Sequence, residues 1–452
     1  MMGRNDKPQK PLFYAFNLDD LVPQDHLLRK IDRFLNLSDL HEHLAPYYSH
    51  TGRPSVDPEL MIRMLLIGYC LGIRSERQLC EEVRLNLAYR WFCRLSIEDP
   101  VPDHSTFSKN RHGRFRESDV LRLVFDSVIR RCSEEDLIKG EGFATDASYI
   151  KADASRQRME NSPVNWNCMA APSRAVREYI EALDNDPTLR RTQKRVSVTD
   201  PMAQWSGEKG PGQFYYCTSY LIDIDHNIIL DVEPTPAHRT MEVASTRKMI
   251  DRVEQKHHIK PKRLLADTAY GAGPMLDWLV KDKNIEPHIP VWDKTNANQE
   301  AFTVNDFIWE PEENRYTCPA GKYLVLGKRT KVTKDKTIIY RAKKSDCETC
   351  QIRSSCTKGK DARKIARSIF EESRNVARTI CKTPEYIQSQ RDRKKVEVLF
   401  AHLKRIMNFD RLRLRGISGA RDEFILAATA QNLKKLAQQR FKPPNHRIGV
   451  PV

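Results

Sequence analysis

The sequence has no apolar segment long enough to cross a lipid bilayer and no sign of a secretory signal at its start. The first residues, MMGRNDKPQKPLFYAF, lack the apolar core of a signal peptide. The longest apolar run, LMIRMLLIGYCLGI at residues 60–73, is interrupted by Arg63 and is too short to span the hydrocarbon layer. Both absences argue against a secreted or integral membrane protein, and we expect a cytoplasmic protein with no membrane partner.

A disulfide framework, internal repeats and low-complexity tracts are also absent. The eleven cysteines are an odd number, and most are scattered singly through apolar patterns, which is typical of reduced thiols in a cytoplasm. Hydrophobic residues make up 40% and charged residues 30% of the 452 residues. This balance excludes a disordered chain and allows two to four domains.

Acidic residues are too few to balance the basic ones. The 76 Lys and Arg residues exceed the 60 Asp and Glu residues, and the formal net charge is +16. Residues 351–415 alone contain 18 basic and 7 acidic residues, a net of +11. The excess indicates a polyanionic partner such as nucleic acid, although a generically basic soluble protein remains an alternative.

Residues 1–135 are expected to form an all-helical N-terminal domain. The segment DPELMIRMLLIGYCLGI begins with Asp57 and Pro58, a pair typical of a helix start. A later helix in PDHSTFSKNRHGRF can be capped by Asp103 or Ser105. Short helices with outward Arg and Lys fit a helix-turn-helix DNA reader, and they fit a dimerisation bundle equally well.

From about residue 136 the hydrophobic period changes from that of helices to that of strands. GFATDASYIKA alternates as a strand with Asp146 in its middle, and FYYCTSYLIDIDHNIILDVEPTP gives two strands joined by a turn. An amphipathic helix at 240–257 follows. The strand of KRLLADTAYGAG comes next and ends on Asp267. Another helix and the strand of IEPHIPVWD follow it. We therefore expect an α/β unit over 136–296 with the order β, β, β, α, β, α, β. His238 could position DNA, but a hydrogen-bonded structural role is more common for such a residue.

Residues 297–370 interrupt this unit as a small β-rich insertion, with strands in NRYTCPAGKYLVLGKRT and KTIIYRAKK. The insertion contains Cys318 and a C-x2-C-x5-C pattern formed by Cys347, Cys350 and Cys356. Four converging thiolates would make a closed structural Zn²⁺ site, which would suit a unit with little core. Ordinary reduced thiols are the alternative. We expect the α/β unit to resume over 371–440 and residues 441–452 to form a flexible tail.

The segment RDRKKVEVLFAHLK at 391–404 is expected to lie in a helix with two distinct faces. A buried stripe at helical spacing consists of Val396, Leu399, Phe400, Leu403, Ile406 and Met407. Arg393, Glu397 and Lys404 fall within roughly 40° of one another on a polar face beside this stripe. The simplest explanation for Glu397 is a surface ion pair with Arg393 four residues earlier, worth only a few tenths of a kcal/mol.

A second explanation joins Glu397 to two other carboxylates. Asp146 lies mid-strand, Asp267 ends a strand, and ligands bind at the carboxyl ends of strands in open sheets. Carboxylates brought together repel one another unless cations neutralise them. Hard oxygen ligands suit Mg²⁺ or Mn²⁺, and two such ions can activate an attacking oxygen and stabilise a leaving one in phosphoryl transfer.

This order of elements resembles the ribonuclease H-like core of DDE transposases. More specifically, the chain resembles transposases of bacterial insertion sequences whose core is split by an insertion before the Glu. In that group the Glu helix carries Tyr, two residues, Arg, three residues, Glu, six residues and Lys. Arg393, Glu397 and Lys404 match the last three positions, whereas Gln390 stands at the tyrosine position. RPSVDPELMIRMLLIGYCLGIRSERQL and PDHSTFSKNR also resemble the helical domain that precedes the core.

The resemblance implies a fold and a site. The fold would be a ribonuclease H-like mixed sheet flanked by helices, with the all-helical N-terminal domain and the small β-rich insertion. Asp146, Asp267 and Glu397 would be the catalytic residues and would hold two Mg²⁺ or Mn²⁺ ions. The residues implied in DNA binding are Arg393, Lys394, Lys395 and Lys404.

The implied function is a transposase that cleaves the ends of its own insertion sequence and joins them to target DNA. Its partners would be the double-stranded terminal inverted repeats, the target DNA and a second copy of the chain in the synaptic complex. Bound to DNA, it would be associated with the bacterial nucleoid. A metal-dependent nuclease of the same fold and a non-catalytic DNA-binding regulator derived from a transposase are the alternatives.

Overall fold

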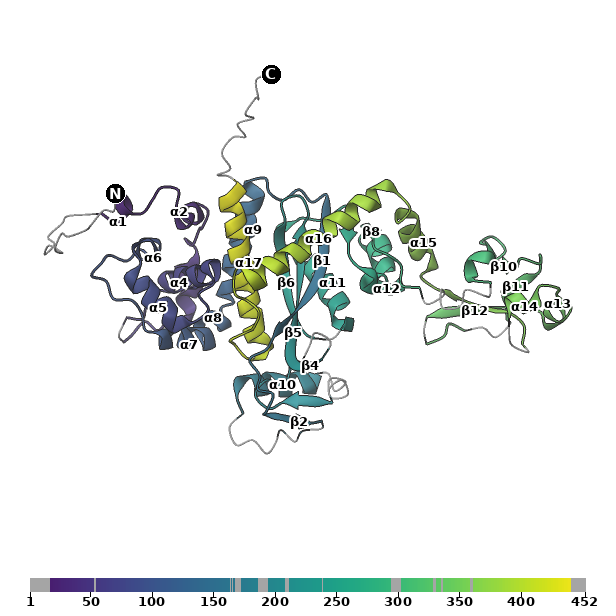
Figure 1. Ribbon diagram of the computed structural model, residues 1–452, viewed down its shortest axis with the longest axis horizontal. Coiled ribbons are helices and arrows are strands. Elements are labelled where there is room, and N and C mark those ends of the chain that lie inside the picture. Colours follow the sequence, from purple (N-terminus) through teal and green to yellow (C-terminus); the bar gives the residue numbers. More distant parts are fainter. Residues whose placement is uncertain are drawn as a thin grey trace, which may run out of the picture.

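The computed structural model describes residues 17–52, 54–162, 164, 166, 172–185, 194–207, 211–237, 239–293, 302–327, 331–334, 336–357 and 361–439. His238 and the expected tail at 441–452 lie outside these residues. Figure 1 shows a helical N-terminal part at one end, a central sheet with its covering helices, and a smaller sheet at the other end. The protein is therefore a mixed α/β protein.

The central sheet has six strands in the part of the chain that is described. They are β1 (Gly142–Lys151), β4 (Gln204–Ser206), β5 (Gln213–Asp223), β6 (Ile228–Pro236), β7 (Arg263–Leu265) and β8 (Glu286–His288). β1 lies between β5, to which it is antiparallel, and β7, to which it is parallel. β8 continues the sheet parallel to β7, and both β6 and β4 pair antiparallel with β5. β1 therefore lies in the interior of the sheet, with antiparallel strands on one side and parallel strands on the other.

Helices cover both faces of this sheet. They are α11 (Arg239–His257), α12 (Gly273–Asp277), α15 (Glu371–Ile380), α16 (Pro384–Arg405) and α17 (Gly416–Gln439). On β1, Thr145 hydrogen-bonds to Thr246 of α11, whereas Ser148 accepts a hydrogen bond from Lys404 of α16. Because odd and even strand positions point to opposite faces, α11 and α16 lie on opposite sides of the sheet. Tyr220 of β5 contacts both α16 and α17, so these two helices share one face.

The N-terminal part is helical and shares its hydrophobic core with the sheet. Its helices are α1 (Leu18–Leu21), α2 (Leu27–Asp32), α3 (Leu40–Leu44), η1 (Ala45–Tyr47), α4 (Pro58–Leu71), α5 (Glu76–Leu85), α6 (Leu87–Phe92), α7 (His104–His112), α8 (Arg114–Glu117) and α9 (Val120–Glu134). Asp57 and Asp103 cap α4 and α7 as predicted. Arg63, which interrupts the apolar run, is buried and paired with Asp32 and Glu59, each at 2.7 Å. Both α4 and α9 pack on α17.

A buried ion-pair network fastens the N-terminal helices to the sheet. Arg122 of α9 reaches Asp231 of β6 at 2.6 Å, and Arg252 of α11 reaches the same carboxylate at 3.1 Å. Asp231 is 1% exposed and Arg122 is 3% exposed. A charge buried this deeply is tolerated only when it is paired, so α9, β6 and α11 are held in one arrangement.

The smaller sheet lies beyond α15 and has its own core (Figure 1). Its strands are β9 (Ile308–Glu310), β10 (Arg315–Thr317), β11 (Tyr323–Leu326), β12 (Thr337–Ala342) and β13 (Lys364–Ser368), and they pair antiparallel in chain order. The short helices η7 (Val304–Asp306), α13 (Lys344–Glu348) and α14 (Arg353–Cys356) complete it. The buried core residues of this unit, among those described, are Phe307, Tyr316, Leu324, Tyr340 and Ile365.

The predicted order β, β, β, α, β, α, β is confirmed as β1, β5, β6, α11, β7, α12 and β8. The strands β4, β9 and β13 were not predicted, nor was the small pair β2 (Met159–Asn161) and β3 (Arg195–Ser197), which lies with α10 (Arg174–Asn185) at the edge of the sheet. One stripe residue was predicted wrongly. Ile406 is 59% exposed, because α16 ends at Arg405 and the chain leaves the helical register there. Within the described residues, none of the helices has both the length and the apolar character needed to cross a bilayer.

Candidate active site

Asp146 and Asp267 are neighbours across two parallel strands. β1 and β7 are paired in register, with Ala144 beside Leu265. Each aspartate comes two residues after its member of this pair, so both lie at adjacent positions on the same face. β7 ends at Leu265, and Asp267 then caps the short helix η4 (Thr268–Tyr270). Its Oδ1 accepts a hydrogen bond of 2.9 Å from the Ala269 backbone N–H.

Glu397 approaches these two aspartates from α16. This helix packs on β1 and β7, on the sheet face to which Ser148 and Asp146 belong. Asp146 is partly buried, and burial raises the pKa of its carboxyl group. The negative charges of Asp267 and Glu397 raise this pKa further, whereas the Ala147 N–H and the Arg393 charge lower it. The electrostatic coupling and the strand register together place all three carboxylates at one site.

A guanidinium group bridges two members of this trio. Arg393 Nη1 lies 3.7 Å from Asp146 Oδ2, and Arg393 Nη2 lies 3.0 Å from Glu397 Oε1. The ion pair between Arg393 and Glu397 that helical spacing predicts is therefore present. Arg393 has a second role that an isolated surface ion pair would not have. It places a positive charge between Glu397 of α16 and Asp146 of β1.

Lys404 and Lys394 also lie beside the site, whereas Lys395 does not. Lys404 Nζ donates a 2.7 Å hydrogen bond to Ser148 Oγ, and Ser148 is two positions from Asp146 on β1. Lys394 lines a pocket next to Asp267. Lys395 instead donates to the Ile224 carbonyl at 2.7 Å and pairs with Asp392 at 2.8 Å. Its ammonium group is occupied within the protein.

The pocket next to Asp267 measures about 400 Å³ and runs along the first half of α16. Its lining combines the η4 turn and the end of β8 with α16 residues that include Tyr386, Gln390 and Arg391. Tyr386 stands one helical turn before Gln390; burial raises the pKa of its phenol, and the Gln390 side chain acts in the opposite direction. A tyrosine is therefore present beside the position where the sequence has Gln390. The i, i+4 spacing of the two residues could have revealed it.

Tyr270 is a second tyrosine that sequence reasoning missed. It follows Asp267 by three residues and is 1% exposed. Among the described residues its hydroxyl has no hydrogen-bond partner. Burial raises its pKa well above the ordinary value, and the negative charges of Glu242, Asp146 and Asp267 act in the same direction. This phenol therefore stays protonated, with a free O–H beside the carboxylates.

The donor set fits a hard divalent cation. Asp146, Asp267 and Glu397 supply only carboxylate oxygens, which are the ligands that Mg²⁺ and Mn²⁺ prefer. Burial is the main cause of the raised pKa of Asp146, and Arg393 supplies the positive charge that lies between Asp146 and Glu397. In the described part of the chain, no three His, Cys, Asp or Glu side chains are placed so that they could already hold a metal ion. Metal binding would therefore require Arg393 and the carboxylates to reorient.

Two comparisons with known protein families cover both ends of the chain. Residues 16–113 match the family described as "Transposase domain (DUF772)". Residues 317–437 match the family described as "Transposase DDE domain", and this segment contains Arg393, Glu397 and Lys404. The resemblance to the DDE transposases of insertion sequences is confirmed by these two matches over the segments that they cover.

One solved structure is similar over most of the chain. It is the piggyBac transposase synaptic complex with hairpin DNA, at 10% identity and a TM-score of 0.30, covering 93% of this chain and 80% of that chain. A similarity of that size is too weak to assign a fold or a function.

Proposed function

We propose that this protein is a DNA transposase that cleaves the ends of its own insertion sequence and joins them to target DNA. The observation that carries the proposal is the meeting of Asp146, Asp267 and Glu397 at one site, with Arg393 between two of them. Three carboxylates held together have no stabilising role of their own, because like charges repel. They are explained if the site binds cations for phosphoryl transfer.

The strand order supports a ribonuclease H-like core. In this core β1 would be central, with antiparallel β5 and β6 on one side and parallel β7 and β8 on the other. The proposed core comprises residues 136–296 and 371–440, and it is split by the insertion at 297–370. Residues 1–135 would form the N-terminal domain for DNA binding, dimerisation or both.

Asp146, Asp267 and Glu397 would hold two Mg²⁺ or Mn²⁺ ions. These ions would make an attacking oxygen more nucleophilic and stabilise the oxygen that leaves. The protein's own residues would align the DNA. Arg393 and Lys404 flank the carboxylates and would contact phosphates of the scissile strand, with Lys394 at the edge of the adjoining pocket. Water would attack first, and the freed 3′-hydroxyl would then attack target DNA.

The charge distribution supports DNA as the partner. The net charge of +16 is concentrated in residues 351–415, the segment that contains α15 and α16. The partners would be the terminal inverted repeats and target DNA. Because two element ends must be held together, we expect at least a homodimer in the synaptic complex.

A strand-transfer assay tests this function against its two alternatives. The substrate is a duplex that carries a terminal repeat taken from the DNA flanking the gene, incubated with Mg²⁺ and a supercoiled target plasmid. A transposase gives 3′ nicks at the repeat end and covalent joining to the plasmid. A nuclease of the same fold gives nicks without joining, and a regulator gives a band shift with neither product. Either of the last two results would reject the proposed function.

A further inference from the structure

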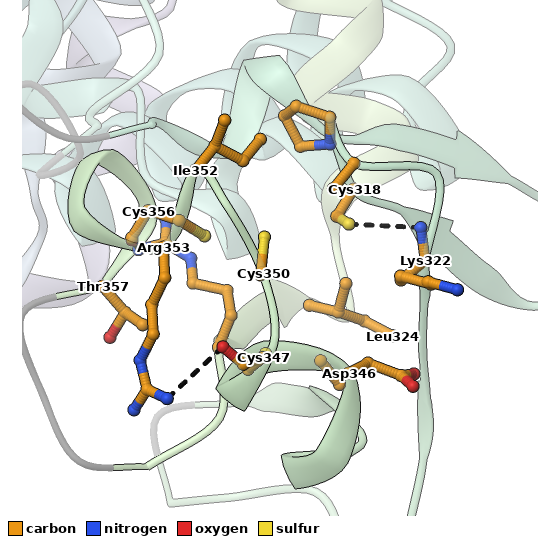
Figure 2. Close-up of a pocket in the computed structure, with 14 residues that line it drawn as sticks. Cys318, Lys322, Leu324, Asp346, Cys347, Cys350, Ile352, Arg353, Cys356 and Thr357 are labelled. Carbon is orange, nitrogen blue, oxygen red and sulfur yellow. Dashed lines mark hydrogen bonds between the residues drawn. The ribbon is translucent and has the colours of Figure 1, made fainter.

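Four cysteines from separate segments of the small sheet line one cavity. Cys318 follows β10, Cys347 lies in α13, Cys350 follows α13, and Cys356 ends α14. All four are reduced and partly buried. Figure 2 shows the thiol of Cys356 directed toward Cys350, whereas the Cys318 thiol is turned toward the Lys322 backbone N–H. Cys318 reaches this cavity from the end of β10, and the three cysteines of the C-x2-C-x5-C pattern reach it from α13 and α14.

The cavity has the size of a single ion. Its volume is about 30 Å³, which is room for one water-sized sphere and far below the roughly 300 Å³ at which pockets begin to hold organic ligands. Apart from the cysteines, the lining includes apolar residues such as Leu324 and Ile352 and charged residues such as Lys322 and Asp346. Several sulfurs around one small space favour a soft-ligand metal centre over a hydrated cation.

The backbone around the cysteines is already organised. The Lys322 N–H donates to Cys318 Sγ at 3.3 Å, and the Gly321 N–H donates to the Cys318 carbonyl at 2.8 Å. Gly321 has a φ of +72°, which allows this tight turn. An N–H directed at sulfur stabilises the thiolate form that a metal requires.

Two arginines hold the other side of the cavity. Arg353 Nη1 donates to the Cys347 carbonyl at 3.3 Å, and Arg363 Nη1 donates to the Cys356 carbonyl at 2.8 Å. Arg363 also reaches the Phe302 carbonyl at 2.7 Å, which ties the cysteine loops to the start of the insertion. Such second contacts fix the direction of metal-binding side chains.

The small sheet needs a stabilising element of this kind. Its buried core has only the five hydrophobic residues named above among those described, while Cys318 and Cys356 pack against that core. Cores of this size rarely hold a unit together without a disulfide or a metal.

We propose that Cys318, Cys347, Cys350 and Cys356 bind one Zn²⁺ in a closed tetrahedral site that stabilises the insertion. Binding releases the thiol protons to solvent, and no redox step is involved. Among the described residues no three His, Cys, Asp or Glu side chains are placed so that they could hold a metal ion, so the site would form by rotation of the four cysteine side chains. The site would fasten the β10–β11 turn to α13 and α14. It is independent of the carboxylate trio.

The first test is the metal content of the full-length protein, purified without chelators and measured by mass spectrometry. We expect about one zinc per chain, the stoichiometry of a closed four-thiolate site. Replacement of Zn²⁺ by Co²⁺ should give the intense visible absorption of tetrahedral thiolate coordination. Absence of zinc, or a disulfide within this group in a non-reducing digest, would overturn the proposal.

A matched pair of variants locates the metal. Cys350→Ser should lose most of the zinc, whereas Cys381→Ser should keep it, because Cys381 is also partly buried but bonds to the Ile289 carbonyl far from the cavity. Equal zinc content in both variants would contradict the assignment. If Cys350→Ser does not fold, the wild-type protein is titrated instead with a thiol-specific mercurial while zinc release is followed. About one zinc should leave as the four thiols react, and zinc that stays bound would refute the site.

Discussion

The most quantitative prediction concerns Asp200, a carboxyl group buried between the central sheet and the start of α17. Its Oδ1 accepts a hydrogen bond of 2.6 Å from the Tyr216 hydroxyl, and its Oδ2 accepts one of 3.1 Å from the Gly416 N–H. The residue is 0% exposed. Burial raises the pKa of Asp200 from 3.8 to about 6, although both hydrogen bonds act in the opposite direction.

A raised carboxyl pKa makes the folded protein bind protons more tightly than the unfolded chain. The stabilisation is fully present below about pH 3.8 and is lost as the pH rises to about 6, where folded Asp200 ionises. A difference of about two pKa units corresponds to about 3 kcal/mol of unfolding free energy. Asp200 alone should therefore lower the stability by about this amount between acidic and neutral pH.

Urea unfolding of the wild-type protein and Asp200→Asn across this pH range measures the effect. The difference in unfolding free energy between the two proteins should change by about 3 kcal/mol, with the variant gaining relative stability as the pH rises. Tyr216→Phe is the matched variant. It removes a hydrogen bond that lowers the pKa of Asp200, so the change should move to higher pH. A difference that does not vary with pH would refute the reasoning, because Asp200 would then titrate normally.

Two further predictions concern DNA affinity and the buried ion-pair network. The logarithm of DNA affinity should fall linearly and steeply with the logarithm of salt concentration, as fluorescence anisotropy can measure, and Lys394→Ala should reduce the slope by about one. A flat dependence would show that residues 351–415 are not the binding surface. Asp231→Ala should destabilise the fold by about 3–5 kcal/mol in urea, because it leaves the buried Arg122 without the carboxylate that it shares with Arg252. Glu134→Ala is the comparison, because it changes an exposed residue. If Asp231→Ala lowers the free energy of unfolding by less than about 1 kcal/mol, as we expect for Glu134→Ala, the network contributes little to stability.

The order of the central strands could be predicted because their signals are local and strong. β1 and β5 are long and carry a strand pattern, and Asp146 follows directly from its place in β1, whereas Asp267 follows the apolar run that forms β7. The three-residue strands β4 and β9 and the five-residue strand β13 are too short to show a clear alternation, or lie in mixed polar segments. They form because a neighbouring strand offers free hydrogen-bonding groups, which is tertiary information.

Site details that depend on side-chain direction could not be predicted. The motif around Glu397 gave Arg393 as a phosphate contact, but nothing local indicates that Arg393 also reaches Asp146. Lys395 belongs to the same basic run as Lys394, yet the rotation of α16 directs it to the Ile224 carbonyl. The partnership of Gln390 with Tyr386 likewise depends on how α16 lies over the pocket.

The central claim is that Asp146, Asp267 and Glu397 act as one unit in DNA cleavage. The direct measurement is Mg²⁺-dependent nicking of the terminal-repeat duplex by Asp146→Asn, Asp267→Asn and Glu397→Gln. Glu372→Gln serves as the control, because this glutamate of α15 is 78% exposed and pairs only with Lys281 among the described contacts. Circular dichroism and anisotropy verify folding and DNA binding.

Each of the three variants should lose cleavage while it folds and binds DNA, and the control should cleave normally. Because the residues act together, the double variant Asp146→Asn with Glu397→Gln should be no slower than either single variant. Near wild-type nicking by any one of the three would remove that residue from the site. Normal nicking by all three would contradict the account.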